Sequence, residues 1–238
     1  KDVINSPYIH ITDNAIINSL IFRGTFDHNI KHLVFPSCSI IYNSRSETHD
    51  EESFDLNAEI AKPYFGGAWN KIYFEKMCEF YSRLGKTKFS IIRHTNLYGP
   101  HDKFDLEKSH VFGATMTKIL KNKSGFIEVW GDGTEGRDLF YIGDMVSLVE
   151  KLIKKQESSF DIISAGSGFT TSINNLVNKI MHHANKNFEV RYDLSQPSIK
   201  TSISLSSSKA KKLYGWEPKT DLDNGILKTL DWYYKNLI

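Results

Sequence analysis

Short apolar runs alternate with longer segments of helical periodicity along this chain, and no other sequence feature constrains the fold as strongly. Runs that are typical of buried strands lie at 32–35, 88–93, 126–130, 160–163 and 188–192. Segments with apolar residues at helical spacing lie at 11–28, 63–84, 110–121, 144–155, 172–183, 206–214 and 222–236. This alternation predicts an α/β protein with a Rossmann-like, mostly parallel sheet and helices on both of its faces.

Residues with strong preferences for helix ends mark several of these boundaries. Pro63 suits the first turn of the second helix, and Gly85 is a stop signal after it. Ser172 is a good N-cap for the helix that follows it, and Thr12 or Asp13 is expected to cap the first helix. That first helix carries apolar residues on one side, namely Ile16, Ile17, Leu20 and Ile21. The end signals therefore predict helices that begin near residues 12, 63 and 172.

The composition narrows the class of protein. A chain of 238 residues with 40% hydrophobic and 24% charged residues suits one larger domain, or one domain with a small lobe. A formal net charge of +2 gives no general argument for nucleic-acid or membrane binding, and no apolar run approaches the ~18 residues of a membrane span. Cys38 and Cys78 form no disulfide framework, and the nine histidines lack metal-site spacing. We therefore expect a cytoplasmic protein without a metal.

Polar residues follow directly on the strand predicted at 88–93. The sequence continues as His94-Thr95-Asn96-Leu97-Tyr98-Gly99-Pro100, in which Gly99-Pro100 ends any regular element. In open α/β sheets, side chains at the carboxyl ends of strands face the ligand crevice. The segment 94–98 is therefore predicted to line a ligand site.

Several further segments occur in a fixed order around this one. They are Ser37-Cys38-Ser39-Ile40-Ile41-Tyr42, Lys71, Asp102-x-Phe104, Ser109-His110-Val111, Val129-Trp130-Gly131-x-Gly133-Thr134-x-x-Arg137-Asp138 and Gly215-Trp216-x-Pro218. In this order and spacing, nearly the whole chain resembles the extended short-chain dehydrogenase/reductase superfamily. Within that superfamily it is most similar to the NAD-dependent nucleotide-sugar epimerases and dehydratases, and among these to the GDP-L-fucose synthases.

The resemblance implies a division of the chain. Residues 1–100 would be the remainder of an NAD(P)-binding Rossmann domain. Residues 101–238 would be mainly a small C-terminal α/β substrate lobe, with elements near 140–165 returning to the Rossmann sheet. In this family the cofactor-binding glycines lie on the first strand and turn, before the position of Lys1. At ~30 residues per βαβ unit, about 70 residues of the family's fold would precede Lys1.

The same resemblance implies an activity, namely hydride exchange at a carbon of a nucleotide-diphosphate sugar with NAD or NADP as cofactor. Lys71 takes the position of a lysine that binds the nicotinamide ribose and lowers the pKa of a tyrosine four residues earlier. That tyrosine position is Gly67 here, which has no side chain to carry a proton. Tyr64 is a better substitute than Tyr73 if Gly66-Gly67 permits a distorted helix start, and it suits a packing aromatic equally well.

The proton-handling hydroxyl of the family falls on Cys38 in this sequence. Ser37 and Ser39 flank it, and a one-residue bulge would bring either hydroxyl into place. Cys38 alternatively fills space as a small buried residue. His110 takes the position of a histidine that contacts substrate and acts as a general acid or base, and its alternative is a helix-capping or buried structural histidine.

Further positions are expected to bind ligand. Arg137 resembles an arginine that holds the substrate diphosphate, and its alternative is a structural pair with Asp138 or Glu135. Asn96 is expected to contact substrate, and Trp130 either packs near the base or fills the lobe core. The expected cofactor contacts are Ser37, Lys71, His94 and Thr95.

Gly67 leaves two alternatives to a standard enzyme. A catalytically impaired member of the family would bind a sugar nucleotide or a partner protein without turning it over. A glycine introduced to trap bound substrate would give the same sequence.

The resemblance also implies a homodimer. The helices through Ile17 and Lys71 resemble the pair that builds a four-helix dimer interface in this family. Tyr73, Met77 and Tyr81 suit such a seam, and they suit plain core packing equally well.

Overall fold

The computed structural model describes residues 7–43, 48–106, 108–196 and 202–237. The α-helices are α2 (Thr12–Asp27), α3 (Phe65–Ser82), α4 (Val111–Leu120), α5 (Ile142–Lys155), α6 (Ile173–His183), α7 (Ser208–Tyr214) and α8 (Leu222–Leu237). The strands are β1 (His32–Cys38), β2 (Thr48–His49), β3 (Lys88–His94), β4 (Asn96–Tyr98), β5 (Phe126–Trp130), β6 (Gly136–Arg137), β7 (Leu139–Tyr141), β8 (Phe160–Ala165), β9 (Thr171–Ser172), β10 (Glu189–Asp193) and β11 (Ser204–Leu205). Short 3-10 turns are η1 (Pro7–His10), η2 (Ser39–Ile41) and η3 (Lys62–Tyr64).

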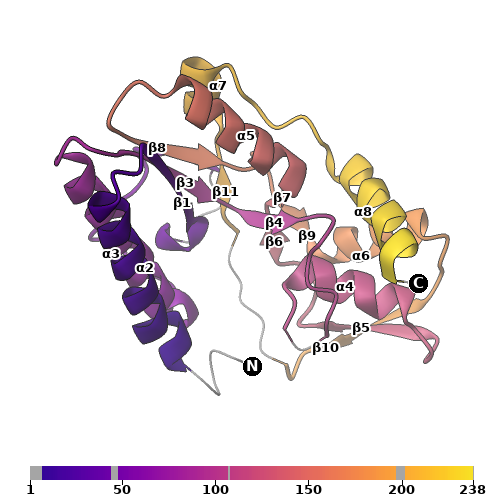
Figure 1. Cartoon of the computed structure of the whole chain (residues 1–238). Coiled ribbons are helices and arrows are strands. Elements are labelled where there is room, and N and C mark those ends of the chain that lie inside the picture. Colours follow the sequence, from indigo (N-terminus) through magenta and orange to yellow (C-terminus); the bar gives the residue numbers. More distant parts are fainter. Residues whose placement is uncertain (1–6, 44–47, 107, 197–201, 238) are drawn as a thin grey trace.

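The first part of the molecule is built on a parallel sheet with the strand order β1-β3-β8 (Figure 1). Successive residues of a strand point to opposite faces of a sheet. Accordingly, Phe35, Phe89 and Ile91 pack with α2 and α3 on one face, whereas Ile92 and Ile163 pack with α5 and α7 on the other. The prediction of an α/β fold with a parallel sheet and helices on both faces is confirmed.

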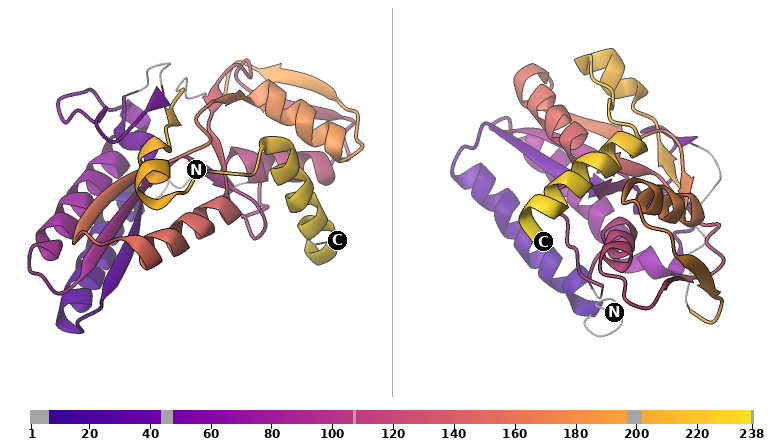
Figure 2. Two further views of the ribbon diagram at one scale, coloured as in Figure 1. Left: turned by 90° about the horizontal axis from the view of Figure 1, so that it is seen from above. Right: turned by 90° about the vertical axis from the view of Figure 1, so that its right-hand side faces the viewer.

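The second part has a core of its own. Strands β5 and β10 pair in parallel, and Ile127 and Val129 of β5 point into this core. Phe112 and Met116 of α4 and Tyr233 of α8 are fully buried in it. Figure 2 shows α8 with α6 in this part, apart from α2 and α3. The described chain therefore buries one core on each face of the β1-β3-β8 sheet and another in the second part.

The helix ends agree only partly with the sequence predictions. The Ser172 side chain caps α6 as expected, because its hydroxyl oxygen accepts a 3.1 Å hydrogen bond from the Asn175 amide. The prediction for α2 was wrong, since its N-cap residue is Ile11 and no side chain makes a cap hydrogen bond there. The segment that begins at Pro63 first forms η3 and only then α3.

Two neighbouring helices present apolar side chains to solvent. The apolar side of α2 is exposed at Ile16, Ile17, Leu20 and Ile21. The side of α3 that is exposed carries Phe65, Trp69, Tyr73 and Phe80. Of the residues considered for a dimer seam, Tyr73 is exposed, whereas Met77 and Tyr81 pack against the core between α2, α3 and the sheet. None of the described helices is long and apolar enough to cross a membrane.

Candidate active site

Cys38 and His94 end neighbouring strands of the parallel sheet. They are register partners at the carboxyl ends of β1 and β3, and adjacent strands lie about 4.8 Å apart. Cys38 is a free thiol and is half-buried. Burial raises the pKa of this thiol, and the nearby Lys71 ammonium acts in the opposite direction. The sheet therefore brings two residues that sequence analysis placed in the site to one edge.

Lys71 reaches this edge from α3. Its Nζ donates a 2.7 Å hydrogen bond to the carbonyl oxygen of Pro36 and lies 4.8 Å from the centre of the Phe35 ring. Burial lowers the pKa of the ammonium, and the carboxylate of Glu75, one helical turn further along α3, opposes that shift. The Lys71 charge is thus held beside the end of β1, next to Cys38.

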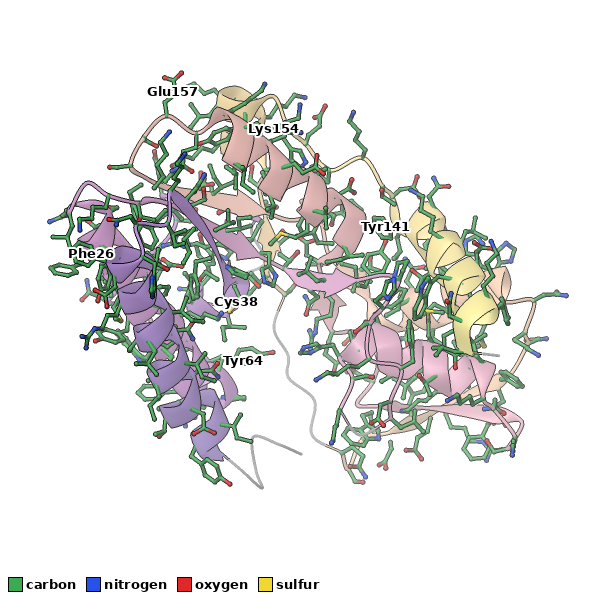
Figure 3. All side chains as sticks on the ribbon, in the orientation of Figure 1. Phe26, Cys38, Tyr64, Tyr141, Lys154 and Glu157 are labelled. Atoms are coloured by element: carbon green, nitrogen blue, oxygen red, sulfur yellow. The ribbon has the colours of Figure 1, made fainter. Side chains whose placement is uncertain are left out.

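Gly67 lies one helical turn before Lys71. A Cβ atom on Gly67 would lie 3.4 Å from Cδ1 of Ile40, so the Ile40 side chain occupies the adjacent space. Tyr64, at the N-cap of α3, packs against the cluster that includes Ile41 and Ile72. Figure 3 shows Cys38 and Tyr64 on the side of the first part that faces the second part.

Ser37 and Ser39 are both buried but take part in different hydrogen bonds. The Ser37 side chain is fully buried, and its hydroxyl donates a 2.6 Å hydrogen bond to Oε1 of Glu75. Its proton is therefore engaged in the core, away from the cofactor position expected for it. Ser39 is buried at the start of η2, where its carbonyl oxygen accepts a hydrogen bond from the Tyr42 amide.

Glu75 belongs to a buried ion pair that sequence analysis missed. Nη2 of Arg93 lies 2.7 Å from Oε2 of Glu75, and only 4% and 5% of the two side chains is exposed. Nη1 of Arg93 also donates to the Tyr42 hydroxyl at 3.1 Å, and the guanidinium stacks on Phe54. The sequence did hold a sign of this pair. The cation Arg93 ends an apolar strand, and the anion Glu75 lies between the buried helix positions Ile72 and Cys78.

His94 is the last residue of β3, after Arg93, and Thr95 follows it. Nδ1 of His94 lies 2.7 Å from the Thr95 carbonyl oxygen. Burial is the main cause of a lowered pKa of His94, and the charges of Lys71 and His110 lower it further. Thr95 is buried, and its Oγ1 has no hydrogen-bond partner among the described residues. A half-buried imidazole and an unsatisfied hydroxyl therefore lie at the carboxyl end of β3.

His110 approaches from the second part of the chain. It is the N-cap residue of α4 but makes no side-chain cap hydrogen bond, and it is exposed. Neither the capping nor the buried alternative applies to it. Its charge affects the pKa of His94 and of Asp102. Cys38, Lys71 and His94 thus lie at the carboxyl ends of β1 and β3, and His110 lies within electrostatic reach of His94.

The expected substrate contacts lie further along the second part. Nδ2 of Asn96 donates to the Asp138 carbonyl at 3.1 Å. Arg137 lies in β6, which pairs with β9, and its Nη1 donates to the Gly136 carbonyl. Trp130 is 48% exposed, so it does not fill the lobe core, and Nζ of Lys118 lies 5.8 Å from the centre of its ring. No group of His, Cys, Asp and Glu that could hold a metal ion occurs among the described residues.

Comparisons with known proteins identify the family and the fold of this chain. The profile described as the NAD dependent epimerase/dehydratase family matches residues 2–166. A GDP-L-fucose synthase of Sinorhizobium fredii is 31% identical over 97% of this chain and 74% of its own length. A GDP-6-OMe-4-keto-L-xylo-heptose reductase from C. jejuni has the same fold, with a TM-score of 0.86 at 21% identity over 97% of this chain and 78% of that one. A GDP-L-fucose synthetase from Naegleria fowleri bound to NADP superposes with a TM-score of 0.83 at 21% identity, covering 94% and 70%.

Proposed function

The chain belongs to the NAD dependent epimerase/dehydratase family, and from this premise we propose that it is an NAD(P)-dependent enzyme acting on a nucleotide-diphosphate sugar. The reaction class is epimerisation, reduction or dehydration through hydride exchange at a sugar carbon. The observation that carries the proposal is the position of Lys71, whose ammonium is held at the carboxyl end of β1. A relative named as a GDP-L-fucose synthase supports the same class of substrate.

The residues at the carboxyl ends of β1 and β3 fit a nicotinamide nucleotide. The buried Oγ1 of Thr95 lacks a partner among the described residues, and a buried hydroxyl without a partner is unfavourable until a polar group reaches it. Lys71 supplies a cation for a ribose hydroxyl, and His94 lies beside both. We assign these three residues to the cofactor, NAD or NADP, which supplies hydride exchange when bound.

Each of the other site residues is assigned to one part of the sugar nucleotide. Cys38 is the register partner of His94 and is the candidate contact of the reacting oxygen, with Ser39, the next residue in the chain, and Tyr64 as further candidates. His110 is exposed and able to exchange a ring proton of the sugar. The guanidinium of Arg137 offers a rigid fork of donors for a diphosphate. Asn96 keeps its side-chain oxygen as an acceptor for a sugar hydroxyl, since its amide donates to Asp138.

A turnover assay tests this proposal. The purified chain is incubated with GDP-, UDP- and dTDP-sugars and with NAD or NADP in both redox states, while sugar products and absorbance of reduced nicotinamide are followed. We expect conversion of at least one sugar nucleotide. Lys71→Met should lower kcat/KM by roughly 10²-fold or more. Lys76→Met, on the exposed side of the same helix, should leave it unchanged. No conversion of any sugar nucleotide by the unaltered chain would refute the proposed activity.

Gly67 supports a second candidate, in which the protein binds a sugar nucleotide or a partner protein without turnover. Ile40 fills the space next to the place where a tyrosine side chain would begin. The double variant Gly67→Tyr/Cys38→Ser separates the two candidates. An unaltered protein that is already as active as the double variant excludes the impaired one, whereas activity only in the double variant favours it.

We further propose a cytoplasmic homodimer. Exposed apolar side chains on the adjacent helices α2 and α3 support the dimer, because contiguous apolar surface favours a protein interface. Both cysteines are free thiols, which suits a reducing compartment.

A further inference from the structure

We propose that Nε2 of His94 is the group that exchanges a proton with the reacting sugar hydroxyl, taking over the task for which Gly67 offers no side chain. The inference rests on the proposed function and adds to it a catalytic residue. Sequence analysis placed His94 only among the cofactor contacts.

The hydrogen bond to Thr95 determines the tautomer of His94. The partner of Nδ1 is a backbone carbonyl oxygen at 2.7 Å, and a carbonyl can only accept. Nδ1 must therefore carry the proton. In the neutral ring, Nε2 then has a free lone pair, and no described residue donates to it. A ring held in this way is oriented and ready to accept a proton at one defined atom.

The surroundings of His94 keep the ring neutral. The charged and titratable groups that face it are Lys71 from α3, His110 from the start of α4 and Cys38 from β1. Burial is the main cause that disfavours an imidazolium, and the Lys71 ammonium acts in the same direction. The hydrogen bond to the Thr95 carbonyl opposes them only in part, so the pKa of His94 lies below its usual value of ~6.5. At neutral pH the ring is thus a base. Its register partner Cys38 and Lys71 both lie at the carboxyl end of β1, so the ring lies at the sheet edge that holds the site assigned to the nicotinamide ribose.

The O–H bond of the sugar hydroxyl breaks and its proton bonds to Nε2 of His94, while the hydride on the same carbon passes to the oxidised nicotinamide. The alcohol becomes a ketone, the ring becomes an imidazolium, and the cofactor is reduced by two electrons. Return of the hydride to the carbonyl carbon takes the proton back from Nε2 and restores the neutral ring.

The first arm of the test reads the ring itself and needs no turnover. Proton–nitrogen NMR of the histidine rings of the full chain, assigned by the signal lost in His94→Gln, should show the proton of the neutral ring on Nδ1 and a pKa below ~6.5. Lys71→Met should raise that pKa, because it removes a neighbouring cation. A neutral ring protonated on Nε2, or a pKa at the ordinary value that Lys71→Met does not move, overturns the inference.

The second arm reads catalysis. For oxidation of the sugar, kcat should rise with pH through the pKa of His94, and His94→Gln should lose this rise together with about 10²- to 10⁴-fold of kcat while KM changes little. His94→Asn keeps a donor for the Thr95 carbonyl, so it controls for misfolding and should lose activity equally. His182→Gln, at an exposed position of α6, should leave kcat unchanged. Turnover by the unaltered chain that His94→Gln matches overturns this inference alone, whereas absence of any turnover overturns it together with the proposed function.

Discussion

The hydroxyl of Ser172 closes the first turn of α6 by accepting the Asn175 amide, whereas no side chain does this for α2. Ser172→Ala leaves that amide without its partner, and we expect the free energy of unfolding to fall by about 1 kcal/mol. Thr12→Ala, in the first turn of α2, should change it by less than about 0.5 kcal/mol. Urea denaturation measures both values. Equal losses in the two variants would contradict the different roles assigned to these hydroxyl groups.

At the same scale, sequence reasoning could name the segment 37–39 but not the member of it that faces the site. Ser37 is drawn into the core by Glu75, which lies 38 positions away in the sequence. Such a partner has no local signature, because it depends on how α3 packs on β1. His94 was named for its position in the family, and its fixed tautomer became apparent only from the hydrogen bond to Thr95.

The Glu75–Arg93 pair joins α3 to β3. Removing one member leaves a buried charge without its partner, so Glu75→Leu or Arg93→Met alone should lower the free energy of unfolding by about 3–5 kcal/mol. In the double variant both charges are gone, and its loss should be well below the sum of the two single losses. Urea denaturation of the three variants gives the coupling between the two side chains.

A surface pair provides the control for this experiment. Lys235 and Asp231 form an ion pair on α8 with both side chains mostly exposed, and Lys235→Met should change the free energy of unfolding by less than about 1 kcal/mol. Strictly additive losses for Glu75→Leu and Arg93→Met would mean that the two charges do not stabilise each other in the fold.

Elements with a long periodic pattern were predictable, whereas the shortest ones were not. The predicted strand at 126–130 coincides with β5, and the helix predicted at 222–236 ends one residue before α8. Strands β4, β6, β7 and β9 have two or three residues each, which is too few to show a period. They exist because partners far away in the chain offer hydrogen bonds, as the Asp138 carbonyl oxygen does for the Asn96 amide at 3.0 Å.

For the molecule as a whole, the exposed apolar sides of α2 and α3 predict the oligomeric state. Leu20 and Tyr73 are 65% and 55% exposed on these adjacent helices. Leu20→Lys/Tyr73→Lys would place two cations per chain in the proposed interface, and we expect the mass from light scattering at micromolar concentration to fall to half. Ile153→Lys, at an equally exposed position of α5, should leave the mass of the dimer intact. A monomeric mass for the unaltered protein would exclude the dimer.

The arrangement of Arg93 and His94 has a consequence for how this chain tolerates insertions and deletions. The two are consecutive in β3, so their side chains point to opposite faces of the strand, and only that of Arg93 faces Glu75 of α3. A slip of β3 by a single residue would exchange them, leaving an imidazole against the buried carboxylate and a guanidinium in the crevice. The ion pair therefore fixes the register of the strand. An insertion or deletion of one residue in β3 would break the Glu75–Arg93 pair and at the same time displace the His94 imidazole from the site.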